Sequence, residues 1–445
     1  MADLHYWEYT FPGNIKQFNG NREVVMKRAF LVLILTVLVF NSQVRAGAIV
    51  KDQTLSLDHC LEIALERHPD IRGSEAAIRA MQSRVRQVET EWNPDVGLSS
   101  SYNRRSVTDK GYDRYSSRLS VSAMLSDGGR TRLESSIARL QLKISEVDYD
   151  AVVQDLLYEV KQSYFNFLKA LKTEEVAVEA VRLYEQRLEQ AIGFYEVGRV
   201  PRYDVTTAEV NLSRKELELV KARTAVRTAL SSLKNAIGLP EAPDFSVEDM
   251  LLRKEIDLNY EDVLTIALEM RPHLRAGRIE SLSARKSVSL AAKANNPVLK
   301  ANAGYSWGDE DFTGNDDLSL GVSLNVALYD GGLAKEKTRE AEYRLEEKEA
   351  DLQSLEQDVV LEVEKAFMEV EDSGEAIDTA AKAVEQAVQN LELANGRYEV
   401  GVGSPVEVTD ATENYISATN SYYSTFYDYW LALAALEKAT GGIIE

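Results

Sequence analysis

Residues that could carry catalysis or bind a metal are few in this chain of 445 residues, and their spacing does not bring them together. A single cysteine, Cys60, excludes a disulfide framework and any cysteine-rich zinc or iron–sulfur site. His59 and His68 lie nine residues apart without a nearby cluster of ligands, and no spacing pairs a nucleophile with a histidine as a hydrolase requires. We therefore expect a protein that is not an enzyme and that holds no metal and no cofactor.

Two Asp-Gly-Gly triplets, at 127–129 and 330–332, are the other candidates for binding chemistry. They resemble fragments of calcium-binding loops, but they lack the alternating acidic residues and the final glutamate of such a loop. Aspartate followed by glycine is typical of a tight turn. We interpret both triplets as turns between two structural elements.

The composition indicates an ordered, acidic chain. It has 72 Asp and Glu against 51 Lys and Arg, a net charge of −21, with 44% hydrophobic and 28% charged residues. Because phosphate binding needs clustered basic side chains, nucleic acid is not expected as a partner. Only nine prolines occur, so very long helices are allowed.

Residues 1–48 have the pattern of an upstream extension followed by a secretory signal peptide. The basic start Met26-Lys27-Arg28 precedes an apolar run at 29–40, and small residues follow at 44–48. These 12 apolar residues would span about 18 Å as a helix, which is too short for the roughly 30 Å hydrocarbon core of a bilayer. Met1 and Met26 are both candidate starts, and no later stretch of 18 apolar residues occurs.

We expect export to remove this segment after Ala46 or Ala48, since small side chains stand there and two residues earlier. N-terminal sequencing of the exported protein tests this expectation. A chain that still begins upstream of Arg45 would contradict the signal assignment.

The rest of the chain consists of one unit that occurs twice, at 49–247 and 248–445. An offset of 203 residues relates the same short motifs in both units: Asn93-Pro94 and Asn296-Pro297, Asp127-Gly128-Gly129 and Asp330-Gly331-Gly332, Tyr195-Glu196-Val197-Gly198 and Tyr398-Glu399-Val400-Gly401. A constant offset through turns, helices and strands indicates an ancient duplication.

Each unit contains two segments in which apolar and polar residues alternate, as in a strand with one apolar face. The clearest segment places Leu318, Leu320 and Val322 on one face, with Ser319 and Gly321 on the other. Strands of about 10 residues can cross a bilayer when tilted, and the polar face suits a wet lumen. We predict membrane strands at about 96–105, 116–125, 298–307 and 318–328.

The segments after the two triplets are predicted to be helices of unusual length. From 131 to 196 there is no proline and a single glycine, Gly193, and the matching segment is 333–399. A helix of this length reaches about 100 Å and must lie along other helices. Glycine-containing turns then lead into return helices at about 203–237 and 406–439.

Four strands per chain cannot close a barrel, and an open sheet leaves backbone groups unsatisfied in lipid. Three copies would supply 12 strands, more than the 8 of the smallest single-chain barrels. We therefore predict a mainly α-helical chain with a membrane β-barrel. The duplicated helix–strand–strand–long helix unit would form, as a trimer, a 12-stranded β-barrel and a long α-helical barrel of matching symmetry. The alternative is a periplasmic coiled-coil tether or adhesin without a pore, which does not predict the alternating strands.

This order of elements resembles the TolC-type outer-membrane efflux factor family. The resemblance runs from Leu55 to about Gly441 and is carried by the start Leu55-Ser56-Leu57-Asp58 and by the two tips, Val197-Gly198…Asp204-Val205 and Val400-Gly401…Glu407-Val408-Thr409-Asp410. The family implies a trimeric channel-tunnel in the cell outer membrane that extends into the periplasm. It would be the exit duct of a tripartite efflux pump or a type I secretion system. The implied partners are a periplasmic adaptor protein, an inner-membrane transporter and outer-membrane lipid. The resemblance does not indicate which substrate is transported.

The resemblance also implies roles for residues at the tips. Glu407 and Asp410 match an acidic ring at the periplasmic entrance, where the carboxylates of a trimer would favour cations. The alternative is that both are ordinary solvated acidic residues at the start of a helix, where the helix dipole stabilises negative charge. Asp204 and Tyr398 match residues that hold neighbouring coiled coils together in the closed state, and simple packing is the alternative for Tyr398.

Gly198 and Gly401 are expected to be structural, because the tight reversals at the tips need positive φ. Contact of the tip turns with the adaptor, through Val197, Gly198, Val400 and Gly401, is an additional expectation. An arginine that the family's prototype carries in the second tip is absent, and Gly403 stands in its place. Closure is therefore expected to use other contacts, with Arg199 and Arg202 as candidates.

Overall fold

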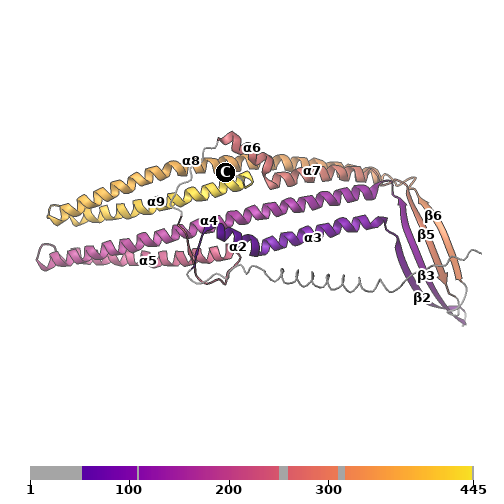
Figure 1. Ribbon diagram of the computed structural model, residues 1–445, viewed down its shortest axis with the longest axis horizontal. Coiled ribbons are helices and arrows are strands. Elements are labelled where there is room, and N and C mark those ends of the chain that lie inside the picture. Colours follow the sequence, from indigo (N-terminus) through magenta and orange to yellow (C-terminus); the bar gives the residue numbers. More distant parts are fainter. Residues whose placement is uncertain (1–52, 108–109, 250–258, 309–315, 443–445) are drawn as a thin grey trace, which may run out of the picture. The chain divides into compact units, whose positions relative to one another are not determined.

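The computed structural model describes residues 53–107, 110–249, 259–308 and 316–442 (Figure 1). The signal segment predicted at 1–48 lies outside these residues. Among the described residues from Thr54 onward, the four-stranded sheet lies at one end of the long helices, and the two helix-to-helix turns lie at the other end (Figure 1).

Two short helices, two strands, a very long helix and a return helix follow one another in each repeat. The first repeat contains α2 (Leu57–Arg67), α3 (Pro69–Glu89), β2 (Asp95–Val107), β3 (Lys110–Ser126), α4 (Arg130–Glu196) and α5 (Arg202–Ala236). The second contains α6 (Tyr260–Met270), α7 (Pro272–Ala291), β5 (Val298–Trp307), β6 (Asp316–Asn325), α8 (Leu333–Glu399) and α9 (Pro405–Thr440). A 3-10 turn follows α3 at Thr90–Trp92, and the short strands β1 (Thr54–Leu55) and β4 (Ser246–Val247) pair in parallel.

Local sequence sets the ends of the helices. Pro69 occupies the first turn of α3, where a backbone N–H would have no partner within the helix. The Asp-Gly-Gly triplets are turns, as predicted, because Gly129 and Gly332 adopt positive φ angles of 82° and 89°. Asp127 Oδ1 accepts a hydrogen bond from Gly129 N at 2.8 Å, and Asp330 Oδ1 accepts one from Gly332 N at 2.9 Å. These aspartates start α4 and α8.

The strands form one antiparallel sheet in the order β2-β3-β5-β6. The register places Leu119 between Leu98 and Tyr305, and it places Leu318 opposite Tyr305. Because side chains alternate along each strand, the apolar residues of all four strands share one face. The other face carries serines, glycines and charged residues such as Arg118.

The predicted strand limits need correction at two places. The strand expected at 318–328 covers Asp316–Asn325 instead, because Asn325 pairs with Val298, the first residue of β5. Pro297 precedes that residue and has no N–H with which to extend the ladder. β2 and β3 are longer than the predicted 96–105 and 116–125, since their hairpin continues through polar residues that interrupt the alternation.

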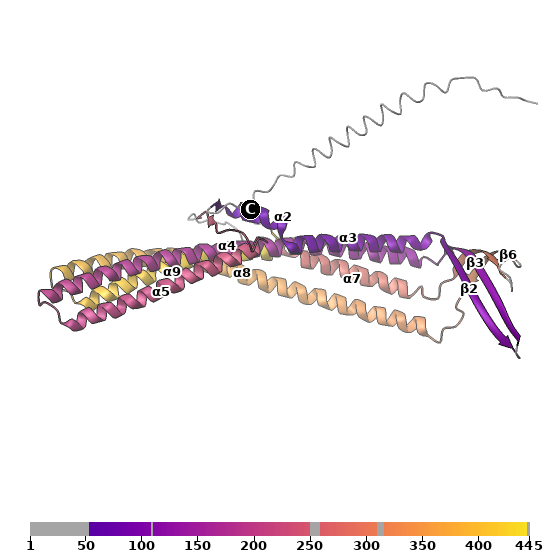
Figure 2. The ribbon, with the colours of Figure 1, turned by 90° about the horizontal axis from the view of Figure 1, so that it is seen from below.

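Helix packing joins the two repeats. α4 packs against α5, α3, α7 and α9, and α8 packs against α9 and α7 (Figure 2). α6 also packs against α8 (Figure 1). A buried core between α6, α7, α8 and α9 includes Leu274, Val363 and Leu436. A second cluster, in which Tyr184 of α4 meets Ile416 of α9, connects the coiled coil α4/α5 to the coiled coil α8/α9. The helices that the structure describes are all too polar, or too short, for a membrane crossing.

Candidate functional site at the helix tips

The chain reverses sharply at two tips, where α4 turns into α5 and α8 turns into α9. Gly198 and Gly401 adopt φ angles of 76° and 82° there, which glycine reaches without strain. Their N–H groups donate to Tyr195 O at 2.9 Å and to Tyr398 O at 3.0 Å. These bonds close the last turn of each long helix.

The side chains next to these glycines point into solvent. Val197 and Val400 are 70% and 73% exposed. They are therefore accessible to another molecule, and their contact with an adaptor stays a prediction.

The two tips touch through an arginine. The Arg199 guanidinium lies 5.0 Å from the centroid of the Phe194 ring, and a Cβ atom added at Gly401 would come within 2.7 Å of Arg199 Nη2. A Cβ atom at Gly403 would meet Tyr398 N at 2.9 Å, so a side chain at this position would require the backbone to shift. An arginine at position 403 would therefore need a different backbone path at the second tip, whereas Arg199 reaches this tip from the first one.

A hollow of about 260 Å³ lies between α4, α5 and the start of α9. We call it the tip hollow, and its polar and aromatic lining consists of Tyr184, Arg187, Tyr203, Thr207, Asn211, Asp204, Tyr398, Thr409 and Asp410. Three of the residues that the sequence singled out, Asp204, Tyr398 and Asp410, therefore lie around one space.

Tyr398 and Asp204 influence each other electrostatically inside this hollow. Burial raises the pKa of Tyr398, and the charge of Asp204 raises it further. Among the described residues, no hydrogen bond joins the two side chains, and the Tyr398 ring packs edge-on against Phe194 at 5.3 Å. Both predicted roles of Tyr398, closed-state contact and simple packing, therefore stay open.

Glu407 lies outside the tip hollow. Its Oε2 is 3.5 Å from Arg397 Nε, and both side chains are about half exposed. Its backbone N–H donates a hydrogen bond to Ser404 Oγ at 3.1 Å, so the Ser404 hydroxyl caps the start of α9. Glu407 and Asp410 thus have different surroundings within one chain, although they stand on the same helix turn.

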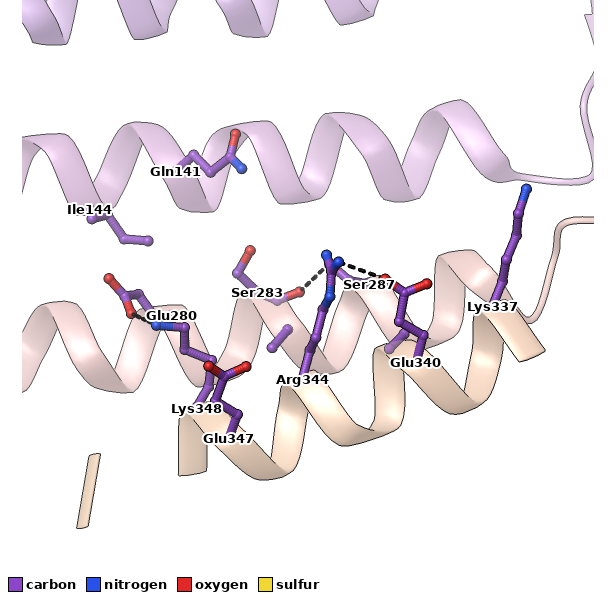
Figure 3. Close-up of a pocket in the computed structure, with 12 residues that line it drawn as sticks. Gln141, Ile144, Glu280, Ser283, Ser287, Lys337, Glu340, Arg344, Glu347 and Lys348 are labelled. Carbon is purple, nitrogen blue, oxygen red and sulfur yellow. Dashed lines mark hydrogen bonds and ion pairs between the residues drawn. The ribbon is translucent and has the colours of Figure 1, made fainter. Parts of the chain in front are cut away.

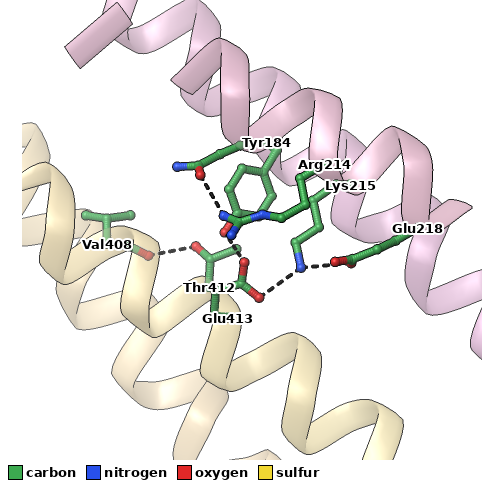
Figure 4. Close-up of polar contacts among 8 residues, drawn as sticks. Tyr184, Arg214, Lys215, Glu218, Val408, Thr412 and Glu413 are labelled. Atoms are coloured by element: carbon green, nitrogen blue, oxygen red, sulfur yellow. Dashed lines mark hydrogen bonds and ion pairs between the residues drawn. The ribbon is translucent and has the colours of Figure 1, made fainter. Parts of the chain in front are cut away.

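A buried lysine network, further from the tips, was not anticipated from the sequence (Figure 4). Lys215 of α5 is only 6% exposed, and its Nζ lies 2.9 Å from Glu413 of α9 and 3.0 Å from Glu218 of α5. Tyr184 of α4 donates a hydrogen bond to Glu413 at 2.7 Å. One carboxylate therefore ties both helices of the first coiled coil to α9.

The charges in this lysine network support one another. Burial by itself would raise the pKa of Glu413, but hydrogen bonds from Tyr184 and Lys215 outweigh it and hold this pKa below its ordinary value. Burial would lower the pKa of Lys215, and its bonds to Glu413 and Glu218 likewise reverse the direction and raise it. The sequence contains a signal that could have revealed the buried lysine. Leu212, Leu219 and Ala222 form an apolar stripe with heptad spacing on α5, and Lys215 lies within that stripe.

A larger hollow of about 670 Å³ lies between α4, α7 and α8, nearer the sheet (Figure 3). Its charged side chains neutralise one another: Lys348 pairs with Glu280 at 3.3 Å, and Arg344 pairs with Glu340 at 2.6 Å. Within the described part of the chain, no three His, Cys, Asp or Glu side chains are placed to hold a metal.

The sequence matches the family model described as outer membrane efflux protein over residues 60–239 and 263–442. The outer membrane protein TolC of Vibrio cholerae is 25% identical over 394 residues, which cover 86% of this chain and 90% of that protein. TolC of Escherichia coli is 23% identical over 300 residues, or 62% of this chain and 60% of that protein. The tether or adhesin alternative finds no support among these relatives.

Solved structures share the fold. The CmeC outer membrane channel of Campylobacter jejuni has a TM-score of 0.76 at 19% identity, and the match covers 87% of this chain and 85% of that one. The outer membrane protein VceC of Vibrio cholerae has a TM-score of 0.75 at 20% identity, covering 87% and 97%. The predicted helical architecture with a small sheet is confirmed. Because the family model matches both repeats, the chain belongs to the outer membrane efflux protein family, whose members are non-enzymatic proteins of the outer membrane that extend into the periplasm.

Proposed function

We propose that three copies of this chain form a channel-tunnel that serves as the exit duct of an efflux pump or a type I secretion system. The observation that carries this proposal is the apolar face of the sheet. Val96, Leu98, Leu318, Leu320, Val322 and Leu324 are each between 64% and 77% exposed. An apolar surface of this extent needs lipid or protein to cover it.

Closure of the sheet requires neighbouring subunits. β2 and β6 are the edges of the four-stranded sheet in one chain, and open edges are not tolerated in lipid. If β6 of one subunit pairs with β2 of the next, three chains eliminate every edge. The apolar face then meets lipid, and the face with Arg118 and Asn302 lines a wet lumen.

Aromatic residues support a membrane boundary on the same face. The Tyr102 and Tyr115 rings lie 5.0 Å apart, and the Tyr305 and Trp307 rings lie 5.6 Å apart. The Tyr102 hydroxyl donates to Asp113 at 2.8 Å, so an apolar ring and a polar partner meet there. This combination is typical of the interface between lipid and water.

The opposite end of the duct is its periplasmic entrance. In a trimer, Glu407 and Asp410 would contribute carboxylates from all three subunits to one acidic ring, which would favour cations. Asp204 and Tyr398 would hold the coiled coils together in the closed state, and the tip turns with Val197, Gly198, Val400 and Gly401 would receive a periplasmic adaptor that leads to an inner-membrane transporter. The alkaline protease secretion protein AprF of Pseudomonas aeruginosa is 27% identical over 248 residues, which cover 54% of this chain and 51% of that protein. Its name is consistent with a secretion system, and the choice between secretion and efflux stays open.

We expect the purified mature protein to be a trimer, because one chain leaves two sheet edges unpaired. Mass determination in detergent measures this directly, and thermal stability should depend on association. A well-folded monomer would rule out a barrel shared between subunits.

Conductance in planar lipid bilayers tests the duct itself. A trimer that spans the bilayer through a shared barrel should give discrete conductance steps. The tether or adhesin alternative predicts an assembled protein that gives none.

A further inference from the structure

We propose that the tip hollow binds a small organic cation that consists of one aromatic ring and an ammonium group. The lining offers three tyrosine rings, from Tyr184, Tyr203 and Tyr398, and two carboxylates, from Asp204 and Asp410. Tyrosine faces attract cations through the ring quadrupole, and carboxylates add a direct charge. The roles assigned above to Asp204, Tyr398 and Asp410 do not require an open space between them.

The two carboxylates are available to a ligand. Among the described residues, neither Asp204 nor Asp410 forms an ion pair, whereas Glu407 on the same turn as Asp410 lies 3.5 Å from Arg397. The Tyr184 ring already interacts with a cation of the chain, because Lys215 Nζ lies 5.7 Å from its centroid. The rings that remain for a ligand are those of Tyr203 and Tyr398, beside the two carboxylates.

Arg187, the basic residue in the lining of the tip hollow, uses its hydrogen bonds to contact α4 and α8. Arg187 Nη1 donates to Gln190 at 2.8 Å, and its Nη2 donates to Asn395 of α8. Its Nε is buried and has no hydrogen-bond partner among the residues that the structure describes. Two carboxylates against one guanidinium leave the lining with net negative charge. The charge of Arg187 therefore does not neutralise the two carboxylates of the lining.

The volume sets the size of the ligand. About 260 Å³ lies just below the range of roughly 300–1,000 Å³ for drug-sized ligands. One ring with an attached ammonium group fits this space, and apolar contacts are supplied by Ala191, Val406 and Val408. A flexible polyamine would lack the ring that this lining matches.

A cation bound in the tip hollow would also affect how easily the two coiled coils separate at the tip. This consequence rests on the proposed function. The hollow is bounded by α4 and α5 on one side and by Tyr398 and the start of α9 on the other. A ligand that contacts both sides favours the arrangement in which they are this close. Its binding should therefore oppose separation of the two coiled coils.

Titration calorimetry of the mature, assembled protein with benzyltrimethylammonium tests the site. In the Ala208→Phe variant a ring fills the hollow from α5 without changing any charge, and the probe should bind about tenfold more weakly. Ala225→Phe, at an exposed position of the same helix, is the matched control and should bind like the parent protein. Asp204→Asn, which removes charge without filling space, should also weaken binding.

The outcomes separate the site from the entrance ring and from the duct. Equal binding by Ala208→Phe and the parent, or no binding to a folded trimer at millimolar probe, would overturn the proposal. Loss of probe binding in Glu407→Gln, with full binding in Ala208→Phe, would place the cation at the entrance ring and would also overturn the proposal.

A second set of outcomes separates the site from the duct. A protein that binds the probe but gives no conductance would refute the duct alone. A conducting protein that does not bind the probe would refute the site alone. Helicity and trimer mass of each variant exclude misfolding.

Discussion

Replacing Glu407 and Asp410 by alanine together should lower the preference for cations over anions by roughly tenfold in planar bilayers. The reason is electrostatic, because carboxylates from three subunits around a narrow entrance concentrate negative potential on passing ions. Reversal potentials under a salt gradient measure the selectivity, and block by a multivalent cation provides a second readout. Both should weaken while the trimer survives, since Glu407 is about half exposed and packs little.

A charge-matched control separates the ring from the general charge of the chain. Glu209→Ala with Glu216→Ala removes the same number of carboxylates from exposed positions on α5, and selectivity should stay near that of the parent. Unchanged selectivity and block in the Glu407 and Asp410 double variant would mean that these residues are only acids at a helix start. The constriction would then lie elsewhere.

Replacing Lys215 by methionine should weaken the attachment between the two coiled coils by about 2 kcal/mol. Removing one partner of a buried ion pair costs roughly 3–5 kcal/mol, and the smaller value applies because Glu413 is 38% exposed and can be partly solvated. Amide hydrogen exchange along α5 and the facing turns of α9 measures the effect locally. Faster exchange should be confined to these segments and leave the core around Leu274 protected.

Two comparisons make this expectation specific. Lys221→Met changes an exposed lysine on the same helix and should alter exchange by less than about 0.5 kcal/mol. Adding Glu413→Gln to Lys215→Met removes the unpaired carboxylate and should restore part of the loss. Exchange that is equal in the Lys215 and Lys221 variants would show that the network contributes nothing.

The same network predicts a dependence on acid. Hydrogen bonds hold the pKa of Glu413 below its ordinary value of 4.5. A carboxyl group with a depressed folded pKa stabilises fully above the unfolded pKa, and this contribution is lost as pH falls through the folded pKa. Protection of α5 and α9 should therefore decrease below about pH 4.5, and the decrease should be smaller in Lys215→Met.

Element types and their order could be predicted because their signals are local. Alternation over Leu318–Leu324 requires one apolar strand face, and the absence of proline from 131 to 196 allows one uninterrupted helix. The offset of 203 residues transfers each assignment to the second repeat. The ends of the strands could not be predicted, because β6 stops where Pro297 removes its partner's N–H, although its own alternation continues.

The sequence by itself determined the family, the duplicated order of elements and the position of the tip residues, since periodicity, turn residues and repeated motifs all act over short stretches of chain. Only the tertiary structure decided that Asp204 and Asp410 share one hollow, that Arg199 reaches Gly401, and that Lys215 is buried against Glu413. These pairs are about 200 residues apart in the sequence. Their contact depends on which faces of α4, α5 and α9 pack together, and such packing leaves no periodic signal in either segment alone.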